Sequence, residues 1–219
     1  MDGLLFDSER IVQRSWEMAG DELGIPHMGD VIYHTLGMNR TGRNEYFRKY
    51  IREDFPFEEF GRLTRDNFWK IVDKEGLPLK KGVKELLAYG KAQGYKMAVA
   101  TSSSREYAMG NLIRAGIDPY FDSVICGDMV KKAKPDPEIY QKASESLGIP
   151  PEYCMAFEDA PGGILSAHQA GMKVIMVPDL VQPTEEIREL TYRVCDSLAD
   201  VIGDGKSGFF PVPGGFQAR

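Results

Sequence analysis

Hydrophobic and polar positions change their spacing once along the chain of 219 residues, near Gly76. Before this point apolar residues recur at the spacing of an amphipathic helix, as Leu63, Phe68 and Ile71 do. After it, short apolar runs such as 97–100 alternate with amphipathic stretches. The pattern therefore predicts an all-helical segment followed by a region of alternating strands and helices.

The helical segment contains no convincing strand, whereas the second region predicts one strand for each short apolar run. Ser8 is expected to cap the first helix, and Asp196-Ser197 a short last one. The tail from 203 to 219 is rich in Gly and Pro and is expected to be irregular. We predict helices over 8–23, 31–36, 43–50, 57–74, 83–94, 106–115, 137–147 and 163–170, and strands over 97–100, 123–126, 154–157 and 174–177.

Alternating strands and helices with short apolar strands are typical of an α/β fold with a doubly wound parallel sheet. The helical residues 10–75 are then an insert, a cap domain, in a discontinuous core formed by 1–9 and 76–219. Ligands of such sheets bind at the carboxyl ends of the strands. An insert placed beside those ends is able to cover the site as a lid.

Composition excludes several classes of partner. The net charge of −6 and the pI near 5.2 give no support to a nucleic-acid or membrane-surface partner. No apolar run approaches the roughly 20 residues that span a bilayer. Cys126, Cys154 and Cys195 lie far apart, which favours free thiols in a reducing cytoplasm. The three histidines are also scattered, so no zinc site is expected.

Candidate chemistry lies at the ends of predicted strands. Thr101 offers a hydroxyl and a backbone N–H to a phosphate oxygen, and Lys134, between an alanine and Pro135, offers a compact positive charge. Glu158-Asp159 puts two carboxylates, which are hard ligands for Mg²⁺, after an apolar run. Each has a simpler interpretation: Thr101 as a turn or cap residue, Lys134 as a solvated lysine, and the acidic pair as a helix cap.

Together these motifs resemble the haloacid dehalogenase-like hydrolases, in the branch with β-phosphoglucomutase and small sugar phosphatases. Asp2-Gly3 and the following Leu-Leu-Phe-Asp-Ser-Glu resemble the family's first motif, and Thr101 and Lys134-Pro-Asp-Pro its second and third. Phe157-Glu-Asp-Ala-Pro-Gly-Gly resembles the family's fourth motif, as does Ala170-Gly-Met beyond it. The likeness extends to about residue 202.

The resemblance implies a magnesium-dependent phosphatase that works through an aspartyl-phosphate. Asp2 would protonate the leaving oxygen, and its carbonyl would ligate Mg²⁺ together with Asp159, while Glu158 orders the metal's surroundings. Thr101 and Lys134 would hold the phosphoryl group. The family's nucleophile, an aspartate at the end of a central strand, would directly precede Met1. We therefore expect the 219 residues alone to be inactive.

Substrate selection is expected in the cap. The resemblance implies that Arg40 and Lys70 contact a small phosphorylated sugar or polyol, with Ser102 beside Thr101 also a substrate-binding candidate. A surface arginine near a turn is the alternative for Arg40. Val12 replaces a histidine of the mutases, which favours a phosphatase over a phosphosugar mutase. A non-catalytic protein that binds phosphometabolites remains the other alternative, and a monomer is possible.

Overall fold

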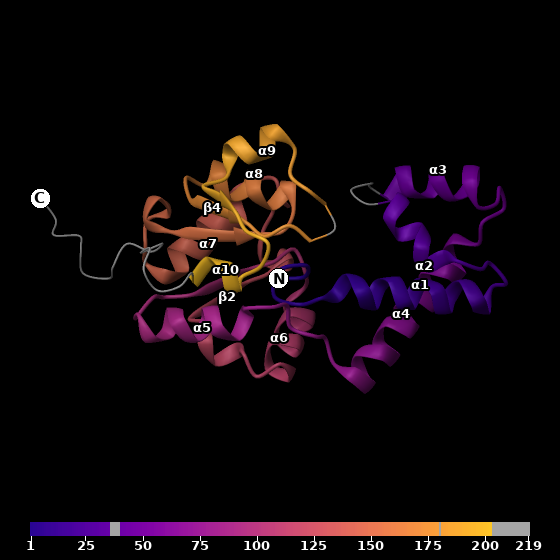
Figure 1. The fold of residues 1–219 in the computed structure, drawn as a ribbon, viewed down its shortest axis with the longest axis horizontal. Coiled ribbons are helices and arrows are strands. Elements are labelled where there is room, and N and C mark those ends of the chain that lie inside the picture. The colour runs from indigo at the N-terminus through magenta and orange to yellow at the C-terminus, as the bar shows by residue number, and fades with distance from the viewer. Residues whose placement is uncertain (36–39, 180, 203–219) are drawn as a thin grey trace, which may run out of the picture. The chain divides into compact units, whose positions relative to one another are not determined.

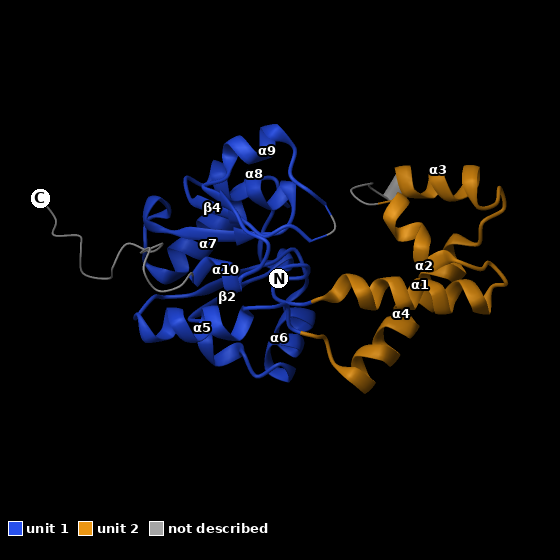
Figure 2. Cartoon of the chain, in the orientation of Figure 1, with its two compact units in different colours: residues 1–6, 79–219 blue, residues 7–78 orange. Residues whose placement is uncertain are grey.

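The chain forms two compact units, which Figure 2 draws in blue and orange. The structure, a computed structural model, describes residues 1–35, 40–179 and 181–202, and the side chains of residues 40 and 41 lie outside that description. Unit 1 comprises residues 1–6 and 79–219, and unit 2 comprises residues 7–78. The expected irregular tail of residues 203–219 lies outside the described residues.

Unit 2 is built from helices around an aromatic core. Trp16 meets Phe47 and Phe60 edge to face, each with ring centroids 5.6 Å apart, which is a favoured geometry for aromatic pairs. Ser8 is the first residue of its helix and not the cap, because Asp7 holds the cap position and makes no side-chain capping bond. The elements are α1 (Ser8–Glu22), α2 (Met28–Val31), a 3-10 helix (Ile32–His34), α3 (Arg40–Tyr50) and α4 (Phe57–Glu75).

Unit 1 alternates helices and parallel strands, as the α/β interpretation predicts (Figure 1). Single turns of 3-10 helix also occur at Asp118–Tyr120, Gly127–Met129 and Pro151–Tyr153. The main elements are α5 (Val83–Ala92), β1 (Ala98–Ala100), α6 (Arg105–Arg114), β2 (Ser123–Ile125), α7 (Glu138–Leu147), β3 (Met155–Glu158), α8 (Pro161–Gln169), β4 (Lys173–Met176), α9 (Glu185–Leu190), β5 (Arg193–Val194) and α10 (Ala199–Ile202).

In the described part of the chain the strands form two sheets, where the sequence predicts one. The first sheet has the order β1-β2 and the second the order β3-β4-β5, all parallel. Val99 pairs with Val124 in the first sheet, and Ala156 pairs with Val174 in the second. β1 is therefore an edge strand of the first sheet, and β3 is an edge strand of the second.

Helices cover these strands with apolar side chains. α7 packs on β1 and β2, and α8 packs on β3 and β4. Ile139, Ile164 and Val174 are almost fully buried in the resulting core. Burying one such side chain contributes about 1.5–3 kcal/mol. Among the helices of the described residues, none combines the length and apolarity that crossing a bilayer requires.

Candidate active site

A tight turn at Asp2-Gly3 brings the start of the chain against the end of β3. Gly3 has a φ of +73°, which only glycine adopts readily, and its N–H donates to the Phe6 carbonyl over 3.0 Å. A Cβ at Gly3 would lie 2.4 Å from Oδ2 of Asp159 and 3.2 Å from Oδ2 of Asp179. The turn therefore packs backbone directly on two carboxylates.

The Asp2 carboxylate is held by two hydroxyl groups. Ser103 Oγ donates to Oδ2 over 2.8 Å, and the Tyr107 hydroxyl donates to Oδ1 over 3.0 Å. Ser103 follows β1, and Tyr107 lies in the first turn of α6. Both carboxylate oxygens are thus held by residues of the β1–α6 connection and of the first turn of α6. These hydrogen bonds orient the Asp2 carboxylate, which is the expected acid and base.

Thr101 begins the same connection and is buried. Its N–H donates to the Ile125 carbonyl over 3.0 Å, and its Oγ1 accepts from the Ser103 N–H over 3.2 Å. The structure therefore shows the turn interaction that was the simpler interpretation of Thr101. Ser102 is exposed, and its carbonyl oxygen would lie 2.2 Å from a Cβ at Gly127, so two loops approach closely here.

Lys134, Glu158 and Tyr140 form a buried polar cluster. Lys134 Nζ donates to Glu158 Oε1 over 2.5 Å and to the Ala100 carbonyl over 3.2 Å. The Tyr140 hydroxyl donates to the same Glu158 oxygen. Burial, followed by the negative charge of Glu158, raises the pKa of Tyr140. Since the Lys134 side chain is 13% exposed and that of Glu158 is 7%, the idea of a solvated lysine is wrong.

Glu158 does not cap the helix that follows it. The cap position of α8 is Ala160, which makes no side-chain capping bond. A Cβ at Gly163 would instead lie 2.1 Å from the Glu158 carboxylate carbon, so the glycine makes room for this buried group. The sequence interpretation of the acidic pair as a helix cap is therefore wrong for Glu158.

Asp159 and Asp179 both place hard oxygen donors beside Gly3. Burial and then the charge of Glu158 raise the pKa of Asp159 to about 6, and the charge of Asp179 acts in the same direction. Lys80 forms an ion pair with Oδ1 of Asp179, whereas Oδ2 of Asp179 is buried and has no hydrogen-bond partner among the residues that the structure describes. An orphaned carboxylate oxygen beside a second carboxylate suits a divalent cation.

Magnesium fits this donor set, because it is held by one or two carboxylates and keeps several waters. Asp159 would provide a carboxylate, Asp2 its backbone carbonyl, and Glu158 a charge beside them. A full cage is not present: in the described part of the chain, no three His, Cys, Asp or Glu side chains cluster in a way that would hold a metal.

Comparison with known proteins decides the family. The sequence profile of the haloacid dehalogenase-like hydrolases matches residues 1–177, which is most of the chain. The chain belongs to the haloacid dehalogenase-like hydrolase family. Its parallel strands and flanking helices are the fold of that family, and hydrolysis is the family's reaction class.

Three relatives of this hydrolase cover most of its length. The protein YhcW of Bacillus subtilis is 32% identical over 204 residues, which is 91% of this chain and 90% of YhcW. The phosphorylated carbohydrates phosphatase of Thermotoga maritima is 31% identical over 175 residues, 80% of this chain and 81% of that protein. The crystal structure of CbbY from Rhodobacter sphaeroides in complex with phosphate is 27% identical, with a TM-score of 0.68 and 93% of each chain covered.

A mutant of the same CbbY has been solved in complex with xylulose-(1,5)bisphosphate. That structure is 26% identical to this hydrolase, with a TM-score of 0.68, and covers 92% of this chain and 93% of CbbY. Relatives of this family member thus include a protein named for phosphorylated carbohydrates and one crystallised with a sugar bisphosphate.

The two cap candidates belong to unit 2. Lys70 lies on α4 and donates to Asn67 Oδ1 over 3.1 Å, and Asn67 Nδ2 in turn donates to Glu22 over 2.9 Å. Arg40 is the first residue of α3, and its side chain is outside the described part. Asp2, the strand-end residues and Ser102 thus belong to unit 1, whereas the two cap candidates belong to unit 2.

Some residues of this hydrolase's site were not predicted from its sequence. Asp179 follows β4 by three residues, so the rule that sites gather at carboxyl ends of strands would have found it. Ser103, two residues after Thr101, carries the same signal. Tyr107 and Tyr140 lie inside helices and Lys80 precedes one, and no sequence pattern distinguishes them from other surface or core residues.

Proposed function

We propose that this hydrolase is a magnesium-dependent phosphatase for a small phosphorylated metabolite, a sugar or polyol phosphate, that works through an aspartyl-phosphate. The named activity of the Thermotoga maritima relative and the sugar bisphosphate bound to CbbY support this substrate class. The free thiols of Cys126, Cys154 and Cys195 support a reducing, cytoplasmic location.

One observation carries the proposal: the charge of Lys134 and the carboxylates of Asp2, Glu158 and Asp159 gather at the strand ends of unit 1. Lys134 lies 3.2 Å from the Ala100 carbonyl, next to Thr101, and 2.5 Å from Glu158. Asp159 follows Glu158 and faces the Asp2-Gly3 turn. A cation, fixed donors and a proton-handling carboxylate are what phosphoryl transfer requires of a protein.

Each group has a part in the proposed reaction. A carboxylate attacks phosphorus to form the aspartyl-phosphate, and the bond from phosphorus to the ester oxygen breaks. Asp2, oriented by Ser103 and Tyr107, donates a proton to the leaving oxygen. Water then attacks the phosphorus of the aspartyl-phosphate while Asp2 takes a proton from that water. The bond between phosphorus and the carboxylate breaks, which releases phosphate and restores the carboxylate. Lys134 and Thr101 hold the phosphoryl oxygens. Magnesium, when bound, supplies positive charge that offsets the charge of the phosphate.

Ser102 and the cap, residues 10–75, would select the substrate through Arg40 and Lys70. Val12 supports hydrolysis over mutase chemistry, because it packs as an apolar residue against the core of unit 2, where a mutase would carry a histidine. A protein that only binds phosphometabolites would retain these contacts without turnover. An assay of phosphate release therefore distinguishes a phosphatase from a protein that only binds its ligand.

The experiment compares three proteins. The first is the chain of 219 residues. The second and third carry an added apolar strand before Met1, and the last residue of that strand is Asp in the second protein and Asn in the third. Phosphate release from a panel of sugar phosphates is measured with magnesium and with EDTA. We expect release only from the Asp protein, and only with magnesium. Turnover by the 219 residues alone would overturn the assignment of the nucleophile. Binding of sugar phosphates without release by the Asp protein would favour the binding function.

A further inference from the structure

The loop that carries Lys134 is mostly exposed. It connects the 3-10 helix Gly127–Met129 to α7, and residues 131–133 are all exposed. The Lys134 side chain, by contrast, is only 13% exposed and reaches Glu158 and the Ala100 carbonyl. A segment with few buried side chains needs polar contacts to keep one conformation. The place of the Lys134 ammonium therefore depends on the contacts that fix this loop.

The carboxylate of Glu138, the first residue of α7, binds the backbone of this loop. The Lys131 N–H donates to Oε1 over 3.1 Å and to Oε2 over 3.0 Å, and the Lys132 N–H donates to Oε2 over 2.9 Å. The Lys142 ammonium, one turn along α7, lies 3.0 Å from Oε1 and donates to the Met129 carbonyl over 2.6 Å. The Lys131 N–H, followed by Lys142, lowers the pKa of Glu138 to about 2, so this carboxylate is ionised at neutral pH.

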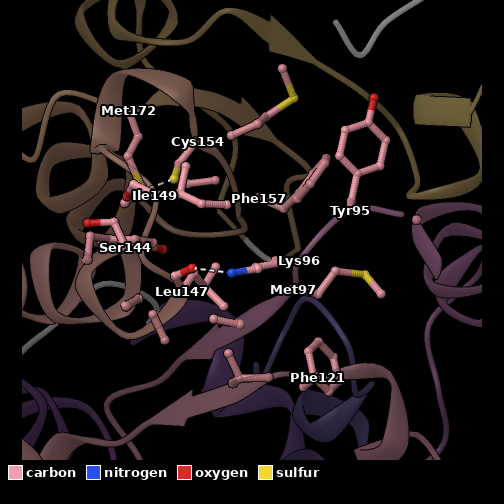
Figure 3. A pocket seen from close by; sticks show the side chains of 18 of the residues that line it. Tyr95, Lys96, Met97, Phe121, Ser144, Leu147, Ile149, Cys154, Phe157 and Met172 are labelled. Atoms are coloured by element: carbon pink, nitrogen blue, oxygen red, sulfur yellow. Dashed lines mark hydrogen bonds between the residues drawn. The ribbon is translucent and has the colours of Figure 1, made fainter. Parts of the chain in front are cut away.

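α7 gives Glu138 a fixed base. Its buried residues Ile139 and Ala143 belong to the core that α7 forms with β1 and β2. At the other end of the helix, the Leu147 carbonyl accepts a hydrogen bond from the Lys96 ammonium over 2.8 Å, which Figure 3 shows beside a cavity of about 530 Å³. A carboxylate on a helix held at both ends is able to keep an exposed loop in one place.

The chain is also tied on the other side of Lys134. The Asp136 N–H donates to the Ala133 carbonyl over 3.0 Å, and the buried Ser166 hydroxyl of α8 donates to the Asp136 carbonyl over 2.6 Å. Lys134 thus lies between two backbone attachments, one made by Glu138 and the other by Ser166. The attachment at Glu138 is made by a charged group, so it can be weakened without changing the size of a side chain.

We propose that Glu138 is a positioning residue of the phosphate site, which binds the loop backbone and thereby sets the Lys134 ammonium at the carboxyl end of β1. The inference rests on the proposed function for the phosphoryl group that Lys134 binds. A carboxylate is required here, because both of its oxygens accept hydrogen bonds. A glutamine in either orientation would turn its own N–H groups toward other donors, which are Lys142 on one side and the Lys132 N–H on the other.

The test compares Glu138→Gln with Glu145→Gln, a control at an exposed position of the same helix. Binding of inorganic phosphate to the 219-residue protein is measured by calorimetry with magnesium present, and the ammonium resonance of Lys134 is followed by NMR. We expect Glu138→Gln to weaken phosphate binding about tenfold and to shift the Lys134 resonance, because a displaced ammonium no longer meets the phosphate oxygens. The control should change neither. If Glu138→Gln does not fold, Glu138→Asp, whose carboxylate is one methylene shorter, replaces it with the same expected result.

The two readouts separate positioning from stability. A Glu138 that only stabilises the fold would lower the melting temperature when replaced, but phosphate affinity and the Lys134 resonance would stay as in the parent protein, and this result would overturn the proposal. A parent protein that binds no phosphate would contradict the proposed phosphatase. The Lys134 resonance then decides the role of Glu138 by itself: a shift in Glu138→Gln supports it, and an unchanged resonance overturns it.

Discussion

Gly163 leaves no space for a side chain beside Glu158: an added Cβ would lie 2.1 Å from the carboxylate carbon and 2.1 Å from Oε2. The contact holds the buried acid of the Lys134 cluster against the first turn of α8. At Gly162, the neighbouring residue in the same helix, an added Cβ would have no atom of the described residues within 4 Å. The two glycines therefore form a matched pair for testing how tightly the cluster is packed.

We expect Gly163→Ala to lower stability by about 1–3 kcal/mol, because the methyl group must displace a buried, paired carboxylate. Gly162→Ala should be neutral or stabilising by about 0.5–1 kcal/mol, since alanine favours the helix. Thermal unfolding of both variants measures the difference. Equal melting temperatures for the two variants would contradict the packing of Glu158 on α8.

Gly3→Ala is expected to destabilise the protein more than a positive φ alone explains. The left-handed backbone disfavours alanine by about 1–2 kcal/mol, and here the methyl group would also meet Asp159. Gly24→Ala is the control, because Gly24 has a φ of +66° and open space around it. Denaturant unfolding should show a clearly larger loss for Gly3→Ala, and an equal loss would mean that the turn does not pack on Asp159.

Lys134→Met should lower stability by about 3–5 kcal/mol, because it leaves the Glu158 carboxylate buried without its cation. Lys91→Met, on the exposed surface of α5, is the control and should stay within about 0.5 kcal/mol. The double variant Lys134→Met with Glu158→Gln should recover much of the loss. A double variant as unstable as Lys134→Met alone would show that the charge pair is not the cause.

The raised pKa of Asp159 predicts a pH dependence of stability. The folded protein keeps the Asp159 proton up to a pH of about 6, whereas the unfolded chain releases it near the ordinary value of 3.8. This carboxyl therefore lowers stability as the pH rises from about 4 to about 6, by at most about 3 kcal/mol at roughly 1.4 kcal/mol per unit.

We accordingly expect Asp159→Asn, measured without metal, to raise the melting temperature at pH 7.5 and to change it little at pH 4. Added magnesium should stabilise the parent protein at pH 7.5 and leave the Asn variant unchanged. If the difference in melting temperature between variant and parent were the same at pH 4 and at pH 7.5, the raised pKa of Asp159 would be contradicted.

Most of the fold follows from apolar periodicity, and the exceptions have physical causes. The four predicted strands 97–100, 123–126, 154–157 and 174–177 are found as β1 to β4 within one residue at each end, because their apolar runs are short and bounded by turn residues. Apolar periodicity does not predict α9, because its sequence, Glu-Glu-Ile-Arg-Glu-Leu, is short and mostly charged. β5 has only two residues, which is too short for any alternation to appear.

The site was less accessible to sequence reasoning than the fold. Thr101, Lys134 and Glu158-Asp159 could be chosen because they follow strands in chain order. Their partners could not, since the hydrogen bond between Tyr107 and Asp2 joins residues 105 positions apart. The sequence also does not show whether Lys134 is buried. In the folded protein its side chain is enclosed and forms an ion pair with Glu158.

The most direct test of the proposed phosphatase is magnesium-dependent phosphate release by the chain preceded by an apolar strand and Asp, compared with its Asp159→Asn variant. Asp21→Asn, at an exposed position of α1, is the control. We predict turnover of a sugar phosphate by the parent and the control, and a loss of at least about a hundredfold in the Asp159 variant. Undiminished turnover by Asp159→Asn would contradict the placement of the reaction at these strand ends.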